Sequence, residues 1–364
     1  MLKRLYTEPR RVLTQPELNT VLLAHERMLS YQRGAAKAEL SRTRLDGLNL
    51  ANRNLAEADF AFASMVSAVA FGTNLDRANL HCSDLRDADF TSARLTKADM
   101  RGASICGARL AFAKLDGADL RAATVAYKGP DGAKADDEVR VDFSNASLKG
   151  ASFGHARLDG VSFEGAILEG ANFKNAHLSN VTFKDAVLTG VNLDDLDLPD
   201  EAFIGCVLGV TADAMEKANA IAAALEAHKL CVSSAAAKGA PAVINGADLR
   251  PLRDRFAGMP LSGLSARNVL AIGIDFSGCQ LQGARFDGAD LRQCEFGDAD
   301  LRGASFRGAR LAHAKFEKAN LGSLRLPNGQ VLAPDFTGAE AVKAQFFHAI
   351  LDTNIAALGL KVAA

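Results

Sequence analysis

The chain has 364 residues, of which 48% are apolar and none is tryptophan, and its formal net charge is −1. No apolar stretch is long enough to cross a bilayer, which excludes a membrane-spanning protein. The six cysteines follow no CxxC or Cys/His spacing, so neither a metal site nor another cofactor is expected.

The N-terminal segment, residues 1–42, predicts a cap made of one helix. Its first residues, MLKRLYTEPRR, are basic but lack the apolar core of a secretory signal, so we expect the protein in the cytoplasm. Thr14 as N-cap, Pro16 in the first turn and Glu17 at the capping-box position predict a helix that begins here. We expect its apolar face, which includes Leu18 and Leu22, to cover the open end of the structure that follows.

Large apolar residues then recur at every fifth position. One frame runs from Leu45 to Val125, a second from Phe143 to Leu208, and a third from Phe276 to Leu326, with Val331 and Phe336 as further members. Five steps turn a helix by about 140°, and five is an odd number of steps along a strand, so neither element keeps such residues on one face. The pattern therefore predicts short extended pieces joined by corners, in a chain that coils.

The repeated units resemble a known family. "GADLR" at 246–250 and "GADL" at 288–291 are similar to the A-[D/N]-L-x-x unit of bacterial pentapeptide-repeat proteins. The resemblance covers about two-thirds of the chain. It implies an all-β solenoid, a right-handed quadrilateral β-helix with twenty residues per coil. On this basis residues 43–208 form a first solenoid and residues 247–336 a second.

Two segments interrupt the repeats. The first, AYKGPDGAKADDEVR at 126–140, contains Gly-Pro and Asp-Gly and predicts a loop that projects from a coil corner. The second, residues 209–246, contains the helix-like TADAMEKANAIAAALEAHKL and predicts a helical linker that ends one stack and caps the next. After it, residues 250–274 fit two frames and contain two prolines, so we expect a degenerate first coil.

The C-terminal segment, residues 337–364, is predicted to be a capping helix. Its apolar stretch FFHAIL places Phe346, Phe347 and Ile350 on one helical face. Two interpretations stay open for these side chains: they cap the core of the second solenoid, or they form a contact between two copies of the chain in a homodimer.

No residue pattern indicates catalysis. The chain has no Gly-rich phosphate loop, no nucleophile elbow and no isolated pair of carboxylates, so we predict a protein that is not an enzyme. His25 and His228 occupy matching positions in the helical segments that precede the two solenoids. We favour burial of these histidines in the caps over metal ligation, because no other metal-binding residue lies near either one in the sequence. Cysteines at inward small positions are predicted to be buried thiols, namely Cys206, Cys279 and Cys294.

The charge distribution suggests a surface for a partner. Residues 141–208 carry four basic and ten acidic side chains, whereas residues 249–331 carry twelve basic and eight acidic ones. We predict a scaffold that binds a protein partner of unknown identity. The resemblance implies an alternative, in which the acidic middle run mimics DNA and binds DNA gyrase or topoisomerase IV; such mimicry needs a long acidic surface. The candidate partner surface comprises Asp194, Asp195, Asp197, Asp200 and Glu201, with Lys128, Asp131, Asp136 and Asp137 of the loop.

Overall fold

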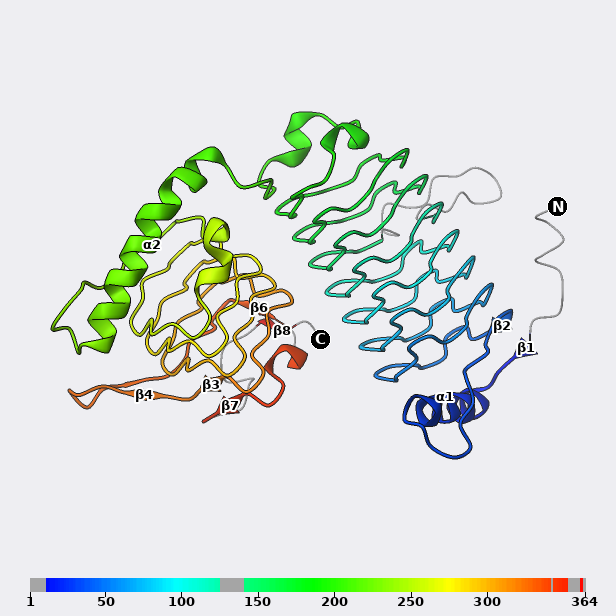
Figure 1. The fold of residues 1–364 in the computed structure, drawn as a ribbon. Coiled ribbons are helices and arrows are strands. Elements are labelled where there is room, and N and C mark those ends of the chain that lie inside the picture. The colour runs from blue at the N-terminus through cyan, green and yellow to red at the C-terminus, as the bar shows by residue number, and fades with distance from the viewer. Residues whose placement is uncertain (1–10, 125–140, 342, 353–360, 363–364) are drawn as a thin grey trace. The chain divides into compact units, whose positions relative to one another are not determined.

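The structure is a computed structural model that describes residues 11–124, 141–341, 343–352 and 361–362 (Figure 1). The chain divides into two compact units, Met1–Gly209 and Val210–Ala364. The regular elements of the first unit are β1 (Arg11–Val12), α1 (Gln15–Leu29), β2 (Thr43–Arg44), η2 (Leu193–Leu196) and η3 (Asp200–Phe203). Those of the second are α2 (Ala212–Ser233), η4 (Arg250–Arg255), β3 (Asn320–Leu321), β4 (Leu324–Arg325), β5 (Val331–Leu332), β6 (Glu340–Ala341), η5 (Lys343–Phe346), β7 (Ile350–Leu351) and β8 (Lys361–Val362).

Between these elements each unit is a stack of twenty-residue coils. Single-residue parallel bridges join positions twenty apart, as in the series Arg44, Ser64 and Asp84. Within one coil, residues 44, 49, 54 and 59 each bridge the residue twenty positions later. The bridges therefore form four columns that run along the stack, and we call these the bridging columns. Because each contact with the next coil is one residue long, few of them extend into strands. Both units are thus solenoids, and the right-handed sense stays a prediction.

The interior of each coil holds two kinds of side chain. Large residues such as Leu80, and the alanines two positions before them, such as Ala78, are fully buried. The outward turns between the extended pieces require a positive φ, which glycine adopts at Gly117 (φ 67°) and other residues adopt at some cost. Each five-residue repeat therefore consists of two inward side chains, one small and one large, and one outward turn.

Phenylalanine rings form columns inside both stacks. Phe163 lies between Phe143 and Phe183, with both centroid distances 5.3 Å and the rings nearly parallel. Cys279 is buried as predicted, its Sγ donates to the carbonyl of Phe256 at 2.9 Å, and burial raises its pKa to about 11. The thiol therefore behaves as a small core side chain. The same holds for Cys294, which is buried, whereas Cys206 is half-buried.

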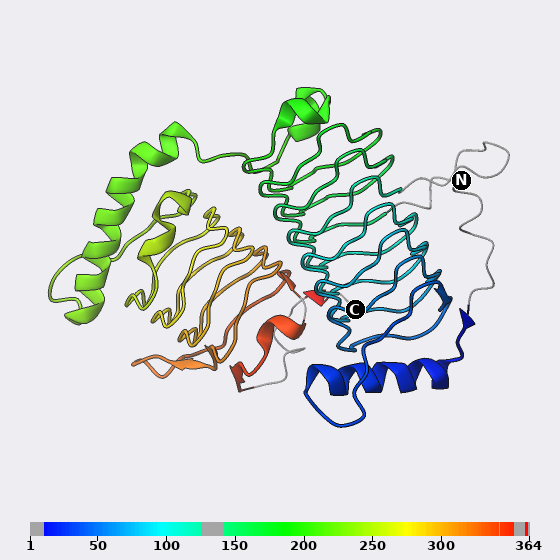
Figure 2. The ribbon, with the colours of Figure 1, turned by 45° about the vertical axis from the view of Figure 1, so that its right-hand side comes forward.

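Helix α1 lies across the first coil of its stack (Figure 2). The predicted N-terminus is confirmed, because the helix begins at Gln15 and the Thr14 N–H donates to Glu17 Oε2 at 2.8 Å. The Gln15 side chain both accepts from the Asn49 N–H, at 2.8 Å, and donates to its carbonyl, at 2.9 Å. β1 adds parallel pairing to β2. The helix and β1 thus bond to backbone groups that would otherwise form an open edge.

The first coil of the second stack is irregular, as expected from residues 250–274, which fit two five-residue frames. Here the large and small inward positions are exchanged: Leu264 precedes Ala266, and Val269 precedes Ala271, and all four are buried. η4 replaces one pentapeptide, so the bridge from Val243 reaches Ser265, twenty-two residues on. Either frame therefore places an apolar residue inside.

The predicted C-terminal capping helix is wrong for the described part of residues 337–364. The solenoid continues instead: β7 pairs in parallel with β3, β8 pairs with β6, and Phe346 stacks on Phe316 with centroids 4.8 Å apart. The physical reason is that Phe336, Ala341, Phe346 and Leu351 keep the five-residue frame. Filling the phenylalanine column buries Phe346, which an isolated helical turn would not do.

A second correction concerns residues 322–334, where the frame predicted inward positions for Leu326 and Val331. The chain forms an antiparallel hairpin of β4 and β5, and Val331 is 56% exposed. The turn sequence Pro327-Asn328-Gly329 favours reversal of the chain. The bridge from Ser305 consequently reaches Asp335, thirty residues on instead of twenty. The predicted loop 126–140 lies outside the described residues.

We expect Phe163→Ala to destabilise the first stack by about 3–5 kcal/mol, because it empties a fully buried position in a column of rings. Phe71→Ala removes a ring of the same size from a half-exposed position and should lose about 1 kcal/mol or less. Urea denaturation of both variants measures the difference. Equal losses would show that the ring column is not the core.

We expect Gly303→Ala to displace the hairpin, because the added Cβ would lie 2.8 Å from Leu324 Cβ and 3.0 Å from Leu332 Cβ. Gly308→Ala is the matched control: its φ of 62° resembles the 65° of Gly303, but nothing lies within 4 Å of its added Cβ. Both variants carry similar backbone strain. Tryptic cleavage after the exposed Arg325 should be faster in Gly303→Ala only, and identical cleavage rates would refute this packing.

Candidate functional site

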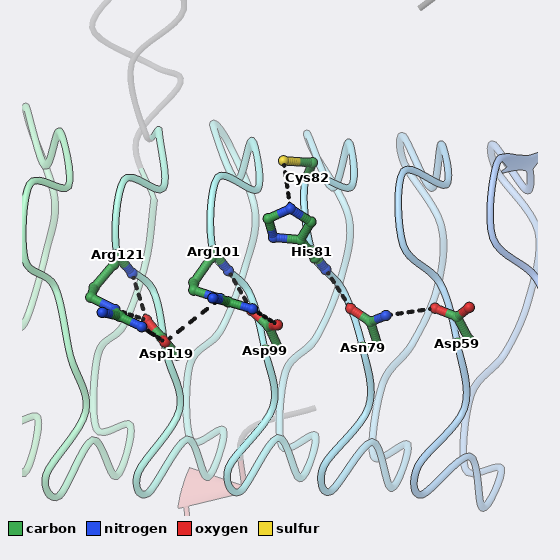
Figure 3. A network of polar contacts seen from close by, with 8 residues as sticks. All are labelled: Asp59, Asn79, His81, Cys82, Asp99, Arg101, Asp119 and Arg121. Carbon is green, nitrogen blue, oxygen red and sulfur yellow. Dashed lines mark hydrogen bonds and ion pairs between the residues drawn. The ribbon is translucent and has the colours of Figure 1, made fainter. Parts of the chain in front are cut away.

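The outward side chains of the bridging columns form polar ladders. In one column of the first stack Asp59, Asn79, Asp99 and Asp119 follow one another (Figure 3). Asn79 Nδ2 donates to Asp59 Oδ1 at 2.9 Å, and Asp59 Oδ1 also accepts the Ala61 N–H at 3.1 Å. The ladder side chains therefore close the turn of their own coil and contact the next coil.

Arginines two residues after Asp99 and Asp119 neutralise these two carboxylates. Arg101 donates to both carboxylate oxygens of Asp99, and these hydrogen bonds lower the pKa of Asp99. Burial raises the pKa of Asp119, but hydrogen bonds from Arg121 outweigh that effect and leave the pKa lowered. The same Asp-x-Arg pair recurs in Asp84–Arg86, Asp248–Arg250, Asp290–Arg292 and Asp300–Arg302.

Other ladder charges pair with the coil above or below. Arg109 binds Asp89 at 2.9 Å, and Lys315 binds Glu295 at 2.7 Å, in both cases twenty residues away. Exposed pairs of this kind add little stability, typically about 0.2–1 kcal/mol each. Their more important effect is that cationic and anionic side chains lie beside one another, as in Arg109–Asp89 and Lys315–Glu295, which weakens the field of either sign along these faces.

The acidic end segment, residues 192–204, differs from the ladders. It contains η2 and η3 and carries Asp194, Asp195, Asp197, Asp200 and Glu201. Four of these side chains are exposed and Asp195 is half-buried. Within the described part of the chain, none of the five carboxylates makes an ion pair or a side-chain hydrogen bond. Ile204, which ends the segment, is 73% exposed.

The sequence predicted this segment as a candidate surface but missed that its charges are unpaired. The signal was available, because the sequence has no lysine or arginine between Lys184 and Lys217. Every Asp-x-Arg pair elsewhere could likewise be found in the sequence. What needed the structure is the pairing between coils, since it joins residues eighteen to twenty positions apart.

The other predicted site residues do not join this segment. Lys128, Asp131, Asp136 and Asp137 lie outside the described residues. Phe346 belongs to the core of the second stack, whereas Phe347 and Ile350 are 62% and 57% exposed on its last described coil. The structure thus separates the three apolar residues that a helix would have placed on one face.

The described residues contain no group of three or more metal-binding side chains, and none of their helices could span a membrane. One thiol lies beside an imidazole: Cys82 Sγ is 3.4 Å from His81 Nε2 (Figure 3). Burial, with a further contribution from Asp99, raises the pKa of Cys82, so the thiol keeps its proton near neutral pH.

Two family models match the coils. The model described as pentapeptide repeats (8 copies) matches residues 54–91, 83–121, 261–298 and 284–322, and the model described as a pentapeptide repeat region matches residues 139–211. The chain belongs to the pentapeptide-repeat family. The matched ranges of this pentapeptide-repeat protein lie in both stacks and leave out α1 and α2.

Solved structures of the family are similar to parts of the chain. A pentapeptide repeat protein from the Arabidopsis thaliana thylakoid lumen is 26% identical over 34% of this chain and 74% of its own, with a TM-score of 0.27. HetL of the cyanobacterium Nostoc, which is involved in the regulation of heterocyst differentiation, is 20% identical over 93% and 94%, with a TM-score of 0.18. QnrB1, a plasmid-mediated fluoroquinolone resistance protein, is 21% identical over 46% and 84%, with a TM-score of 0.21. No curated protein sequence matches significantly.

Proposed function

We propose that this pentapeptide-repeat protein is a non-enzymatic scaffold that binds a protein partner at the acidic end segment. The observation that carries the proposal is the contrast in charge pairing. Along the ladders, carboxylates such as Asp89, Asp99 and Asp119 have cationic partners in their own or the neighbouring coil, whereas the five carboxylates of residues 192–204 have none among the described residues. An unpaired charge can attract a partner without first breaking an internal pair.

The chemistry of the segment defines the kind of partner. Five carboxylates within eight residues attract lysine and arginine side chains, and the exposed Ile204 offers apolar area beside them. Charged rims set orientation and association rate, whereas an apolar side chain at the centre supplies binding free energy. The partner should therefore present a basic surface around an apolar side chain.

The stack supports such a surface by holding it rigidly. η2 and η3 form part of the last coil, because Val207, which follows them, bridges Val187 of the coil before, and Leu196 of η2 is buried in the core of the first stack. A preorganised segment loses little conformational entropy on binding. We further propose that the coils wind in a right-handed sense with a quadrilateral cross-section; four bridging columns per coil support the four-sided section.

The alternative is a DNA mimic that binds a type II topoisomerase. Mimicry requires a long surface of unneutralised negative charge, comparable to a row of phosphates. In the first stack, pairs such as Asp89–Arg109 and Asp99–Arg101 interrupt the acidic charge. The five carboxylates of the end segment, which have no cationic partner among the described residues, lie within eight positions of the sequence. These observations favour the scaffold over the mimic.

We expect affinity capture from the cell's own extract to retain a protein partner that is lost when the end segment is neutralised. The test variant carries Asp→Asn at 194, 195, 197 and 200 and Glu201→Gln. The control variant removes five charges from the ladders instead, by Asp→Asn at 59, 84, 89, 99 and 119. Asparagine already occupies such bridging positions at Asn54 and Asn79, so the coils should tolerate it.

The proposed surface predicts that a partner binds the wild type and the ladder variant and fails to bind the end-segment variant. Equal binding to all three proteins would refute the surface. Capture of gyrase or topoisomerase IV subunits that is lost in the ladder variant would favour the mimic. Circular dichroism and urea denaturation of each variant establish that it is folded.

A further inference from the structure

The two capping helices share a buried histidine with the same contact. His25 of α1 is 0% exposed and His228 of α2 is 2% exposed. The Ala38 N–H donates to His25 Nδ1 at 3.1 Å, and the Ala242 N–H donates to His228 Nδ1 at 3.0 Å. In both modules this bond joins the helix to the segment that leads into the first coil.

The bond determines where the ring proton lies. Because Nδ1 accepts a hydrogen bond in both rings, the proton of the neutral imidazole is on Nε2. In His25 this N–H donates to the carbonyl of Ala56 at 3.0 Å. His228 Nε2 has no hydrogen-bond partner within the described part of the chain, although the carbonyls of Leu261 and Ser262 lie near enough to favour its protonated form. His25 is thus bonded on both sides.

The surroundings favour the neutral ring. Burial is the main cause that lowers the pKa of both histidines. Near His25, Lys37 lowers the pKa further, while Glu26, Glu57 and the Ala56 carbonyl oppose it; Glu26 is itself engaged by Arg53 at 2.7 Å. The described groups that affect His228 besides burial are two backbone carbonyls, and no charged side chain contributes.

Protonation would break the contact with the coil. A proton on Nδ1 turns the acceptor into a donor that points at another donor, the N–H of Ala38 or Ala242, and it places a charge in a buried site. We propose that His25 and His228 are acid-released latches that hold the capping helices on the first coils of the two stacks. When α1 leaves, the backbone groups of Asn49 lose the Gln15 side chain that bonds them, and an unpaired coil edge is exposed.

The direction of the pH effect follows from the lowered pKa. The undocked helix exposes its histidine, whose pKa returns to about 6.5, so the undocked state binds the proton more tightly than the docked state. The latch therefore contributes fully above about pH 6.5. Its contribution falls as the pH decreases from there through the lower pKa of the docked state.

Amide hydrogen exchange of the full-length protein tests the proposal between pH 7.5 and pH 5, with rates corrected for the intrinsic pH dependence. We expect protection at Ala38 and Asn49 to fall by up to about tenfold per pH unit within the window. Inner coils such as residues 85–120 should keep their protection. Ala242 should respond in the same direction in the second unit.

His25→Asn separates the latch from general acid destabilisation, because the asparagine side-chain oxygen can accept from Ala38 but does not titrate. Its protection at Ala38 should be independent of pH. His155→Asn is the matched control, since His155 is exposed and has a φ of 58°, which asparagine tolerates; it should behave like the wild type.

Unchanged protection of the wild type at pH 5, or an equally steep loss in His25→Asn, would overturn the proposal. If His25→Asn does not dock at any pH, the imidazole resonances of the wild type give the answer by NMR titration. A pKa of His25 below about 6.5 supports the latch, and a pKa at or above that value refutes it.

Discussion

Backbone hydrogen bonding between coils twenty residues apart is the constraint on which the rest of this structure depends. Each coil bonds the N–H and C=O groups of its extended pieces to the coil above and the coil below, so the two ends of a stack are left with open edges. α1 closes one such edge with Gln15, Glu26 and His25, each of which bonds to a backbone group of the first coil, at Asn49, Asn54 and Ala56. The interior and the ladders follow from the same register, because it places Phe163 between the rings of Phe143 and Phe183 and places Arg109 beside Asp89.

The five-residue frame made most of this fold predictable. It is strict enough that Leu45, Phe163 and Phe306 could be placed inside from the sequence. It misled at residues 322–334, where Leu326 and Val331 are five apart by coincidence and the hairpin turn prevails. In the last segment the helical spacing of Phe346, Phe347 and Ile350 obscured the frame that Phe336 and Phe346 continue. Local periodicity could not decide the last segment, because its deciding contacts, such as that of Phe346 with Phe316, are with residues thirty positions away.

The position of the candidate site could be predicted from the sequence, but the absence of ion pairs at its carboxylates was not predicted. The acidic residues of 192–204 could be read from the sequence, but their significance depends on the state of all the other charges. Asp99 and Asp119 look as acidic in the sequence as Asp194 does, yet they are bonded to Arg101 and Arg121. Pairs of this kind reduce the charge along the sides of the stack, whereas the carboxylates of residues 194–201 have no cationic partner among the described residues. This arrangement also explains why net charge, close to zero over the chain, says little about function.

The central claim is the twenty-residue register, and paired cysteines test it most directly. Asn54 bridges Asn74, so their backbones are about 4.8 Å apart, within the range that a disulfide spans. Asn54 and Val69 are also both outward, but they belong to different columns. After mild oxidation, peptide mapping by mass spectrometry should find the 54–74 disulfide in Asn54→Cys/Asn74→Cys and no 54–69 disulfide in Asn54→Cys/Val69→Cys. A 54–69 disulfide that forms as readily, or the absence of the 54–74 disulfide, would contradict the register and the account built on it.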